Sequence, residues 1–405
     1  MGKKQLGFLT LIGILLLSMG LPMNAFASDE KVIHTVQNHT KKQTSLKPID
    51  IGEKMQRFTF DAGLDFEYPD AVRGIYVTGP SVGVKRFDKL VNLVDTTDLN
   101  AMVIDIKEDH GNLTFKPKKG SPYEDIAINY INDPRKMLES LEEKGIYPIA
   151  RIVVFKDSVL AKKHPEWSFK KNGKVWTNGK GEAFVSPFQK EVWKYNVEIA
   201  KMAAELGFQE IQFDYVRFPE GFEDYDDILD YSLGDYKDSS IKNVQRRVNA
   251  VTDFVSYAKE ELEYYGVDVS VDIFGYAATI PEAPGIGQNF TKISKNVDVI
   301  SSMIYPSHWT SYFGIEKPDT QPYKLVSEYA KVENEVLGKL EDPPTSRPWI
   351  QDFEAPWLYS GATKQYGKAE VEAQIKALKE HGIEEFLIWN ASNDYTNNVD
   401  YTPLD

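Results

Sequence analysis

The chain alternates between strand-like and helix-like segments eight times, and this regular alternation narrows its possible folds more than any other feature. The strand-like runs are short and rich in β-branched and aromatic residues, whereas several helix-like segments end at a glycine. We expect strands at residues 73–79, 100–107, 146–155, 210–216, 267–275, 298–306, 347–353 and 383–391. We expect helices at residues 86–99, 134–145, 186–207, 240–265, 322–338 and 368–382.

Strands separated by helices predict the α/β class, with a parallel sheet and helical crossovers. Eight such units predict a (β/α)8 TIM barrel with enlarged βα loops, which we place in residues 71–405. An open doubly wound sheet is the alternative. That fold favours the spacing G-x-G-x-x-G in its first turn, and the segment RGIYVTGPSVG lacks it.

The first 27 residues have the pattern of a secretory signal peptide. Lys3 and Lys4 precede an apolar run over residues 6–21, and Ala-Phe-Ala at 25–27 supplies a cleavage site. An uncleaved membrane anchor is the alternative, but it needs about 20 apolar residues. We therefore expect export with cleavage, no membrane span afterwards, and a secreted, cell-surface or cell-wall-associated protein.

Residues 28–70 are polar and mixed, which predicts a linker or N-terminal extension. The formal net charge of −14 argues against binding to nucleic acid. The chain has no cysteine, no P-loop, no G-x-S-x-G turn, and no zinc spacing among its six histidines. We expect neither a metal nor a cofactor, and the acidic run at 223–238 is expected to be a solvated loop.

Charged residues gather where the expected strands end. Four of the eight strands end in an aspartate, at Asp105, Asp214, Asp272 and Asp352. Side chains alternate along a strand, so Gln212 and Asp214 face away from Ile211 and Phe213. Each aspartate alone could simply cap the next turn or helix. Together, at the end of a barrel where active sites lie, they favour a functional acidic rim.

Two carboxyl groups that face one bond are the minimum machinery of glycoside hydrolysis. One must be ionised, and the other must carry a proton for the leaving oxygen. Asp214 and Asp272 lie on neighbouring expected strands, about 4.8 Å apart at the backbone. Their side chains can therefore reach the separation of about 5–5.5 Å that is typical of retaining enzymes.

Aromatic residues are concentrated in the loops beyond the same strand ends, in IYPSHW (304–309), APWLY (355–359) and WNAS (389–392). Such rings could bind the flat faces of sugars, or they could simply close the barrel mouth. The predicted substrate-binding residues are Asp105, Lys107, Arg217, Tyr305, His308, Trp309, Trp357, Trp389 and Asn390.

The segment FQEIQFDYVRFPEG, followed by SVDIFGY, MIYPSHW, PWIQDF and LIWNAS, resembles a bacterial family of glycosyl hydrolase domains that is distantly similar to α-amylase-type glycosidases. The resemblance covers about residues 70–400 and implies a (β/α)8 barrel. It implies that Asp214 is the nucleophile, that Asp272 is at the acid position and that Asp352 is the third carboxylate. The amylase pattern has Glu at the acid position, so Glu220 and Glu354 remain alternative acids.

The sequence thus predicts a secreted glycoside hydrolase that acts on a polysaccharide or oligosaccharide, with Asp214, Asp272 and Asp352 as catalytic residues. A non-catalytic carbohydrate-binding protein of the cell surface is the alternative. A third reading is a metal-dependent hydrolase with Asp105, Asp214 and Asp272 as oxygen ligands. The sugar, the linkage and the oligomeric state stay open.

Overall fold

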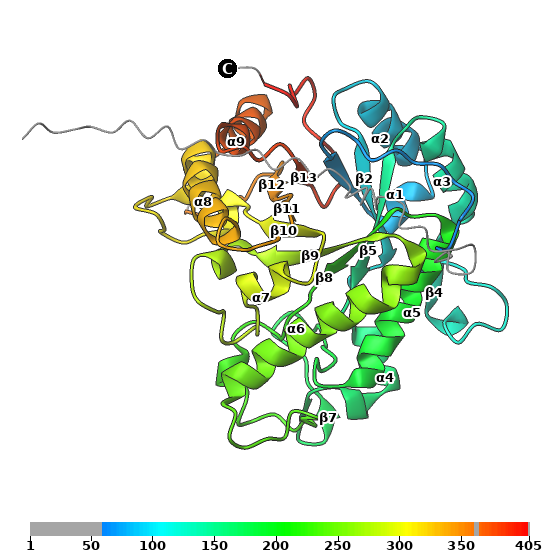
Figure 1. Cartoon of the computed structure of the whole chain (residues 1–405), viewed down its shortest axis with the longest axis vertical. Helices are drawn as coiled ribbons and strands as arrows, with labels where there is room; N and C mark the ends of the chain where they lie inside the picture. Colours follow the sequence, from blue (N-terminus) through cyan, green and yellow to red (C-terminus); the bar gives the residue numbers. More distant parts are fainter. Residues whose placement is uncertain (1–58, 360–363, 404–405) are drawn as a thin grey trace, which may run out of the picture. The chain divides into compact units, whose positions relative to one another are not determined.

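A computed structural model describes residues 59–359 and 364–403, so the expected signal peptide and most of the expected linker lie outside the described residues. Eight parallel strands in the described part form one sheet, and β1 pairs with both β2 and β13, which closes the sheet into a barrel (Figure 1). The strands are β1 (Arg73–Val77), β2 (Ala101–Lys107), β5 (Tyr147–Val153), β8 (Glu210–Asp214), β9 (Asp268–Phe274), β10 (Val299–Met303), β12 (Trp349–Gln351) and β13 (Phe386–Trp389). The predicted TIM barrel is confirmed.

Helices on the outside of the barrel connect most of these strands (Figure 1). The expected helices are present as α2 (Arg86–Asp95), α3 (Pro134–Glu142), α5 (Lys190–Leu206), α6 (Asn243–Leu262), α8 (Pro322–Leu337) and α9 (Lys368–Glu380). Helix α5 ends at Gly207, whose φ of 115° few other residues adopt. The shorter helices are α1 (Gly79–Val82), α4 (Ser158–Lys163) and α7 (Phe290–Ser294).

Several short elements enlarge the loops between strands and helices. Strand β3 (Leu113–Phe115) pairs antiparallel with β2 and parallel with β4 (Ala127–Ile131). Strands β6 (Lys170–Lys171) and β7 (Lys174–Val175) form a hairpin, and β11 (Thr345–Ser346) pairs with β10. The 3-10 turns are η1 (Glu124–Ile126), η2 (Pro165–Trp167), η3 (Phe222–Asp224), η4 (Glu263–Tyr265), η5 (Gly275–Ala278), η6 (Pro306–His308) and η7 (Pro318–Thr320).

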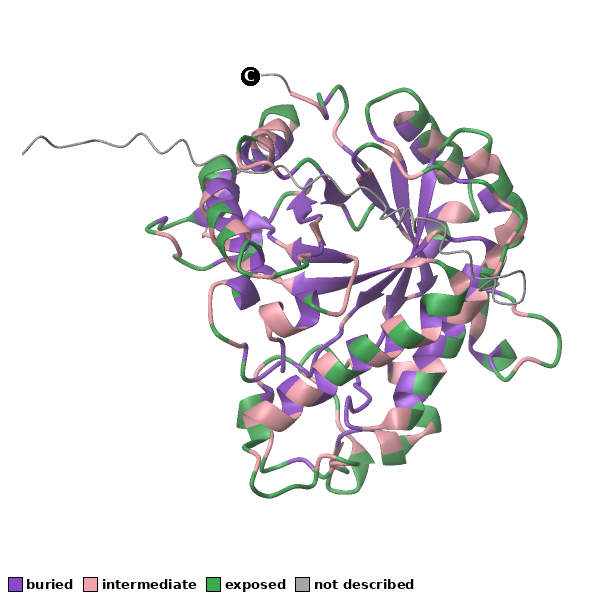
Figure 2. Cartoon of the chain, in the orientation of Figure 1, coloured by how far each residue is buried: buried purple, intermediate pink, exposed green. Residues whose placement is uncertain are grey.

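The barrel strands are buried on both faces, as Figure 2 shows. Outward-facing side chains such as Ile211 and Phe213 join the large apolar core that packs against the helices. Inward-facing side chains such as Ile149 and Trp349 form a second, smaller core inside the barrel. Gln212 donates a 3.3 Å hydrogen bond to Ser301 within the interior, so the alternation expected for this strand is confirmed.

An ionic layer fills the amino-terminal end of the barrel interior. Arg347 is fully buried and donates to Glu210 at 2.8 Å and to Glu385 at 2.7 Å, and it also contacts the hydroxyl of Tyr68 at 2.6 Å. Burial raises the pKa of Glu210, although the Arg347 guanidinium acts in the opposite direction. These groups face one another and form hydrogen bonds with one another, so we infer that this layer stabilises the fold and does not bind a ligand.

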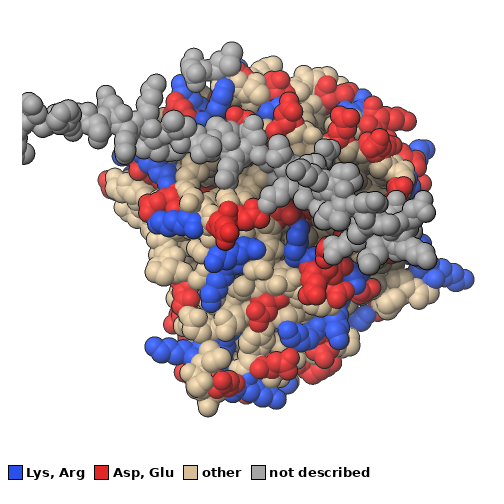
Figure 3. Space-filling model, in the orientation of Figure 1, with Lys and Arg blue, Asp and Glu red and all other residues tan. Residues whose placement is uncertain are grey.

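Acidic and basic side chains are intermixed over the face of the molecule drawn in Figure 3. Within the described residues, no helix is both long enough and apolar enough to cross a bilayer.

Candidate active site

A buried arginine holds the carboxyl end of the barrel together. Arg151 on β5 is 1% exposed, and its strand lies between the strands that carry Asp105 and Asp214. Its Nη1 donates to Asp105 Oδ1 at 2.7 Å, and its Nε and Nη2 donate to Asp214 Oδ2 at 3.0 and 2.6 Å. One guanidinium therefore fixes two carboxylates from two different strands.

Asp214 uses both of its oxygens as hydrogen-bond acceptors. Oδ2 accepts from Arg151, and Oδ1 accepts from the backbone N–H of Tyr215 at 2.6 Å. Tyr215 has a φ of 53°, a left-handed conformation that is uncommon for a residue with a bulky side chain. The end of β8 is thus strained at the point where its backbone meets the carboxylate.

Asp272 occupies a different environment on the neighbouring strand β9. It is 1% exposed, and its Oδ1 accepts a 2.7 Å hydrogen bond from the indole N–H of Trp349. Burial and the negative charge of Asp214 raise the pKa of Asp272 well above its usual value, against smaller opposing effects of Trp349 and Arg151. A raised pKa keeps this carboxyl protonated at a pH where an ordinary aspartate is charged.

Asp105 completes the buried group. Tyr76 donates to Asp105 Oδ2 at 2.7 Å, and burial raises the pKa of Asp105 to about 6 although Arg151 acts in the opposite direction. The Tyr76 ring is stacked on Trp389 with centroids 4.0 Å apart, and the Arg151 guanidinium carbon lies 5.3 and 5.4 Å from the two ring centroids. Trp389 therefore forms an aromatic wall beside the carboxyl groups.

More aromatic side chains adjoin this wall. The ring of Tyr305 lies 6.3 Å from Trp389 and 6.0 Å from Phe353 between centroids, and its edge-on neighbour His308 is exposed. Burial, together with the charges of Asp272 and Asp214, raises the pKa of Tyr305. The structure thus brings together six of the predicted site residues, Asp105, Asp214, Asp272, Tyr305, His308 and Trp389.

Lys107 lies elsewhere, contrary to the expected alternation along its strand. A register shift between Asp105 and Lys107 places Lys107 opposite Ile152, whose side chain belongs to the outer core. Its Nζ lies 2.6 Å from Asp157 Oδ2, and both side chains are 0% exposed. Lys107 therefore faces away from the barrel interior. Its ammonium group forms an ion pair with Asp157 and donates a hydrogen bond to the backbone carbonyl of Val153 on β5.

Asp352 is also separate from the acidic group. It shares the outward face of its strand with Ile350, and its two oxygens accept from the backbone N–H and the hydroxyl of Thr396 at 2.8 and 2.6 Å. Asn390 donates to the backbone carbonyls of Asp352 and Asp394 at 2.6 and 2.8 Å. The hydrogen bonds of Asp352 and Asn390 therefore fix the conformation of the segment that follows β13.

Arg217 does not pair with Asp214, because Arg151 fills that role. Arg217 instead contacts Glu220 at 3.1 Å, and its guanidinium carbon lies 4.8 Å from the ring centroids of Tyr215 and of Phe274. Glu220 is exposed, as is the other alternative acid, Glu354.

Two of the predicted aromatic residues make no ring contact with this wall among the described residues. Trp309 is 8% exposed and packs in the outer core, with ring centroids 5.1 Å from Tyr312 and 5.9 Å from Tyr329. Trp357 is 66% exposed at the surface. Neither ring adjoins the wall that Trp389 and Tyr305 form.

The sequence analysis missed five residues of the site, namely Tyr76, Asp109, Arg151, Lys156 and Trp349. Arg151 had a usable signal, because it is the one charged side chain in the apolar run IYPIARIVVF. Asp109 and Lys156 lie just beyond the ends of β2 and β5, and their partners become visible only in three dimensions. Asp109 Oδ1 lies 3.0 Å from Arg151 Nη2 and 3.4 Å from Lys156 Nζ.

Within residues 59–359 and 364–403, no group of three or more histidine, aspartate or glutamate side chains is arranged to hold a metal ion. The guanidinium of Arg151 instead joins Asp105 to Asp214, which are two of the three ligands of the metal-dependent alternative.

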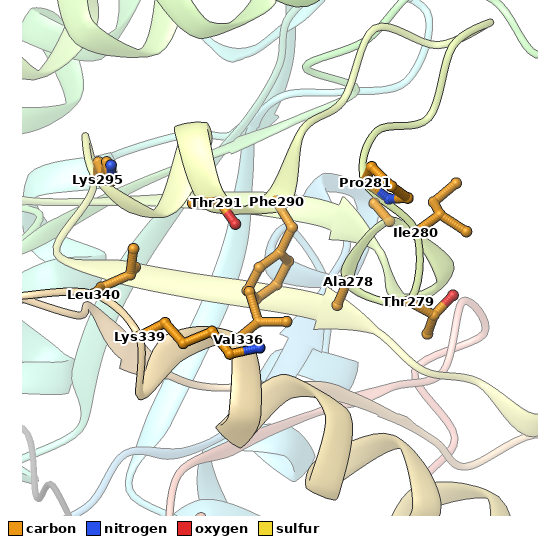
Figure 4. A pocket seen from close by; sticks show the side chains of 11 residues that line it. Ala278, Thr279, Ile280, Pro281, Phe290, Thr291, Lys295, Val336, Lys339 and Leu340 are labelled. Carbon is orange, nitrogen blue, oxygen red and sulfur yellow. The ribbon is translucent and has the colours of Figure 1, made fainter.

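A cavity of about 400 Å³ lies apart from this cluster (Figure 4). Its lining residues come from the segment after β9, from helix α7 and from the end of helix α8, and they include Phe290, Val336, Lys295 and Lys339. None of the residues that line this cavity belongs to the acidic group.

Residues 74–395 match the protein family described as "Putative glycosyl hydrolase domain". The chain belongs to this family. A hypothetical protein from Ruminiclostridium thermocellum ATCC 27405 is 34% identical over 49% of this chain and 96% of its own, with a TM-score of 0.42. Membership of this family supports a glycoside hydrolase-like function for the protein.

Two other solved structures agree in fold. The PgaB glycoside hydrolase domain from Bordetella bronchiseptica is 15% identical over 80% of this chain and 95% of its own, with a TM-score of 0.55. A β-galactosidase from the psychrophilic Marinomonas ef1 is 15% identical over 79% and 54%, with a TM-score of 0.50. At these identities the likeness shows the barrel fold alone. No curated protein matches the chain.

Proposed function

We propose that this protein hydrolyses glycosidic bonds in a polysaccharide or oligosaccharide, with Asp214 and Asp272 as its carboxylate pair. The observation that carries the proposal is the contrast between two neighbouring carboxyl groups. Asp214 accepts hydrogen bonds from Arg151 and from a backbone N–H, whereas burial and the charge of Asp214 raise the pKa of Asp272. Carboxyl pairs in opposite protonation states mark acid and base assignments in hydrolases.

In this mechanism, Asp272 donates its proton to the oxygen of the leaving sugar. The Asp214 carboxylate attacks the anomeric carbon, or it stabilises the positive charge that develops there. Asp272 then accepts a proton from the water that releases the product. The hydrogen bond from Trp349 orients the acid, and Trp389 and Tyr305 supply rings for the sugar to stack on.

Retention of the anomeric configuration is part of the proposal. Strands β8 and β9 pair in parallel, with Gln212 opposite Ser270 and Phe213 opposite Val271. One residue further along, Asp214 and Asp272 stand on strands about 4.8 Å apart. This spacing suits the roughly 5–5.5 Å between carboxyl groups of retaining enzymes better than the wider gap of inverting ones. Export by the N-terminal signal, to the cell surface or the medium, is also proposed.

The purified full-length protein should be screened against a polysaccharide panel, with mass spectrometry of the products. On the best substrate, we expect Asp272→Asn to keep the fold and to lower kcat by about 10²–10⁴-fold, the usual contribution of a general acid. Proton NMR of the first-formed anomer should show retained configuration. An Asp272→Asn variant with full activity would reject the assignment, and an inverted product would reject retention alone.

A non-catalytic carbohydrate-binding protein is the second candidate, and the burial of the pair favours it. Asp272 is 1% exposed and Asp214 is 4% exposed, so a sugar reaches them only if side chains at the mouth move. A glycan array distinguishes the two functions. Binding without product after long incubation supports the binding protein, whereas product release that depends on Asp272 supports the hydrolase.

A further inference from the structure

Asp109 is the most accessible carboxylate that contacts the central arginine. Its side chain is 41% exposed, compared with 4% for Asp105 and 6% for Asp214. Its Oδ1 faces both Arg151 Nη2 at 3.0 Å and Lys156 Nζ at 3.4 Å. Among the described residues, all contacts of this carboxylate are made through Oδ1, so Oδ2 remains available to accept hydrogen bonds from a ligand.

The loop that carries Asp109 has a well-defined conformation. The Glu108 carboxylate accepts hydrogen bonds from the backbone N–H groups of His110 and Asn112 at 3.1 and 3.0 Å. Gly111 has a φ of 104°, and a Cβ there would lie 2.0 Å from Oδ1 of Asp157. A carboxylate held by such a loop loses little conformational entropy when it binds a ligand.

Asp109 is also close to the proposed nucleophile. Its Oδ1 and Asp214 Oδ2 contact the same guanidinium nitrogen of Arg151, at 3.0 and 2.6 Å. The distance between the two oxygens therefore cannot exceed the sum of these two hydrogen-bond distances. Asp109 Oδ1 therefore lies beside the carboxylate that we propose as the nucleophile.

Asp109 is held in its charged form by its two cationic neighbours. Burial acts to raise the pKa of Asp109, but the charges of Arg151 and Lys156 outweigh it, and the pKa is lowered overall. An ionised carboxylate is an acceptor without a proton to give, and it forms stronger hydrogen bonds with hydroxyl donors than a neutral group does.

We propose that Asp109 is a substrate-binding residue whose Oδ2 accepts a hydrogen bond from a sugar hydroxyl group beside the bond to be cleaved. This inference rests on the proposed carbohydrate site and adds a residue that reaches the substrate from the mouth. Because its side chain is the most exposed of the three carboxylates, Asp109 is the one that an entering sugar contacts most easily. It affects binding more than the chemical step.

The test compares Asp109→Asn with the unmodified protein on the best substrate of the panel. We expect KM to rise about 10- to 100-fold, the value of a hydrogen bond to a charged group, with kcat changed less than about threefold. The same loss should appear as a higher Kd for an oligosaccharide in the Asp272→Asn background, where turnover is slowed about 10²–10⁴-fold. That second measurement stays informative if hydrolysis itself is absent.

Glu182→Gln is the matched control, because Glu182 also faces Lys156, at 3.5 Å, and is 34% exposed, but it does not contact Arg151 in the described residues. We expect its KM to stay within about twofold of the unmodified value. Equal effects of both variants on KM would overturn the proposal in favour of a general charge effect through Lys156. A lower kcat at unchanged KM in Asp109→Asn would also overturn it, because Asp109 would then act through Arg151.

Asp109→Glu keeps the charge and moves the oxygens by one methylene group. We expect normal thermal unfolding with a KM still raised, because the contact depends on the position of the oxygen. If neither Asp109 variant folds, the residue is a structural element of the loop and the proposal fails. Binding that depends on Asp109 in a protein without hydrolysis would retain this inference and reject the proposed hydrolysis.

Discussion

Replacing Arg151 by methionine should destabilise the protein strongly. Met is long, flexible and apolar, so it can keep the packing against the rings of Tyr76 and Trp389 while it removes the charge. The substitution leaves Asp105 and Asp214 buried without the guanidinium that lies 2.7 and 2.6 Å from them.

The magnitude follows from burial. Removing one partner of a buried ion pair costs about 3–5 kcal/mol, because the other charge remains without compensation. Arg151 is 1% exposed and faces three carboxylates, so we expect at least this loss. Since folded proteins are stable by about 5–15 kcal/mol, this loss is a large share of the total.

The loss should depend on pH. Without the guanidinium, the folded-state pKa of Asp105 should rise further above its present value of about 6. A carboxyl with a raised folded-state pKa stabilises the fold at low pH, and this contribution disappears as the pH rises through that pKa. Arg151→Met should therefore be more destabilised at pH 8 than at pH 5.

Thermal and urea unfolding, followed by circular dichroism at both pH values, measure this effect. Lys331→Met is the control, because Lys331 forms an exposed pair with Glu328 at 2.7 Å that is worth at most about 0.5 kcal/mol. The reasoning is refuted if Arg151→Met unfolds like the control at pH 8, or if its deficit is larger at pH 5.

Three further predictions use single contacts. The stability of Asp105→Asn relative to the unmodified protein should increase by up to about 3 kcal/mol as the pH rises from 4 to 7, because the pKa of Asp105 is raised from 3.8 to about 6 in the fold. Urea unfolding at both pH values measures this change, and a stability difference that is the same at both pH values contradicts it. Trp349→Phe removes the hydrogen bond that lowers the pKa of Asp272, so this pKa should rise and the alkaline limb of the plot of kcat/KM against pH should move to higher pH. If that limb does not move, Asp272 is not the general acid. Gly111→Ala should cost more than about 1–3 kcal/mol in thermal unfolding, because its Cβ meets a side-chain oxygen at 2.0 Å; Gly120→Ala, also at positive φ but with open space around it, should cost less.

The barrel could be predicted from the sequence because its strands are buried on both faces and its helices on one. These two patterns differ in period, and the turns between them carry glycine and proline, so all eight strands were found within a few residues of their ends. The alternation in β8 also placed Asp214 correctly on the inner face, since Ile211 and Phe213 lie in the outer core.

The site could be predicted only where the alternation held to the last residue of a strand. The register shift after Asp105 turned Lys107 outward, and Asp352 shares the outward face with Ile350. A sequence pattern does not contain a local change of register, because that change depends on pairing with another strand. The pairing of Arg151 with carboxylates from two other strands is likewise a property of the closed barrel.

Variants of the two buried arginines at opposite ends of the barrel interior distinguish an effect on stability from an effect on activity. Arg347 at the amino-terminal end is 0% exposed and holds Glu210 and Glu385 at 2.8 and 2.7 Å, in the same manner in which Arg151 holds its partners at the other end. Arg347→Met should therefore lose about 3–5 kcal/mol as well. Its partners do not belong to the proposed catalytic pair, and the charge of Glu210 raises the pKa of Asp272 less than burial and the charge of Asp214 do. We therefore expect kcat per folded molecule to stay unchanged, and the pH dependence of kcat/KM to change only slightly, at a temperature where the variant is folded. Arg151→Met should change both, because it removes a cation that contacts Asp214 directly. If the two variants alter the pH dependence equally, activity is sensitive to the stability of the whole barrel, and the assignment of a catalytic role to its carboxyl end loses this support.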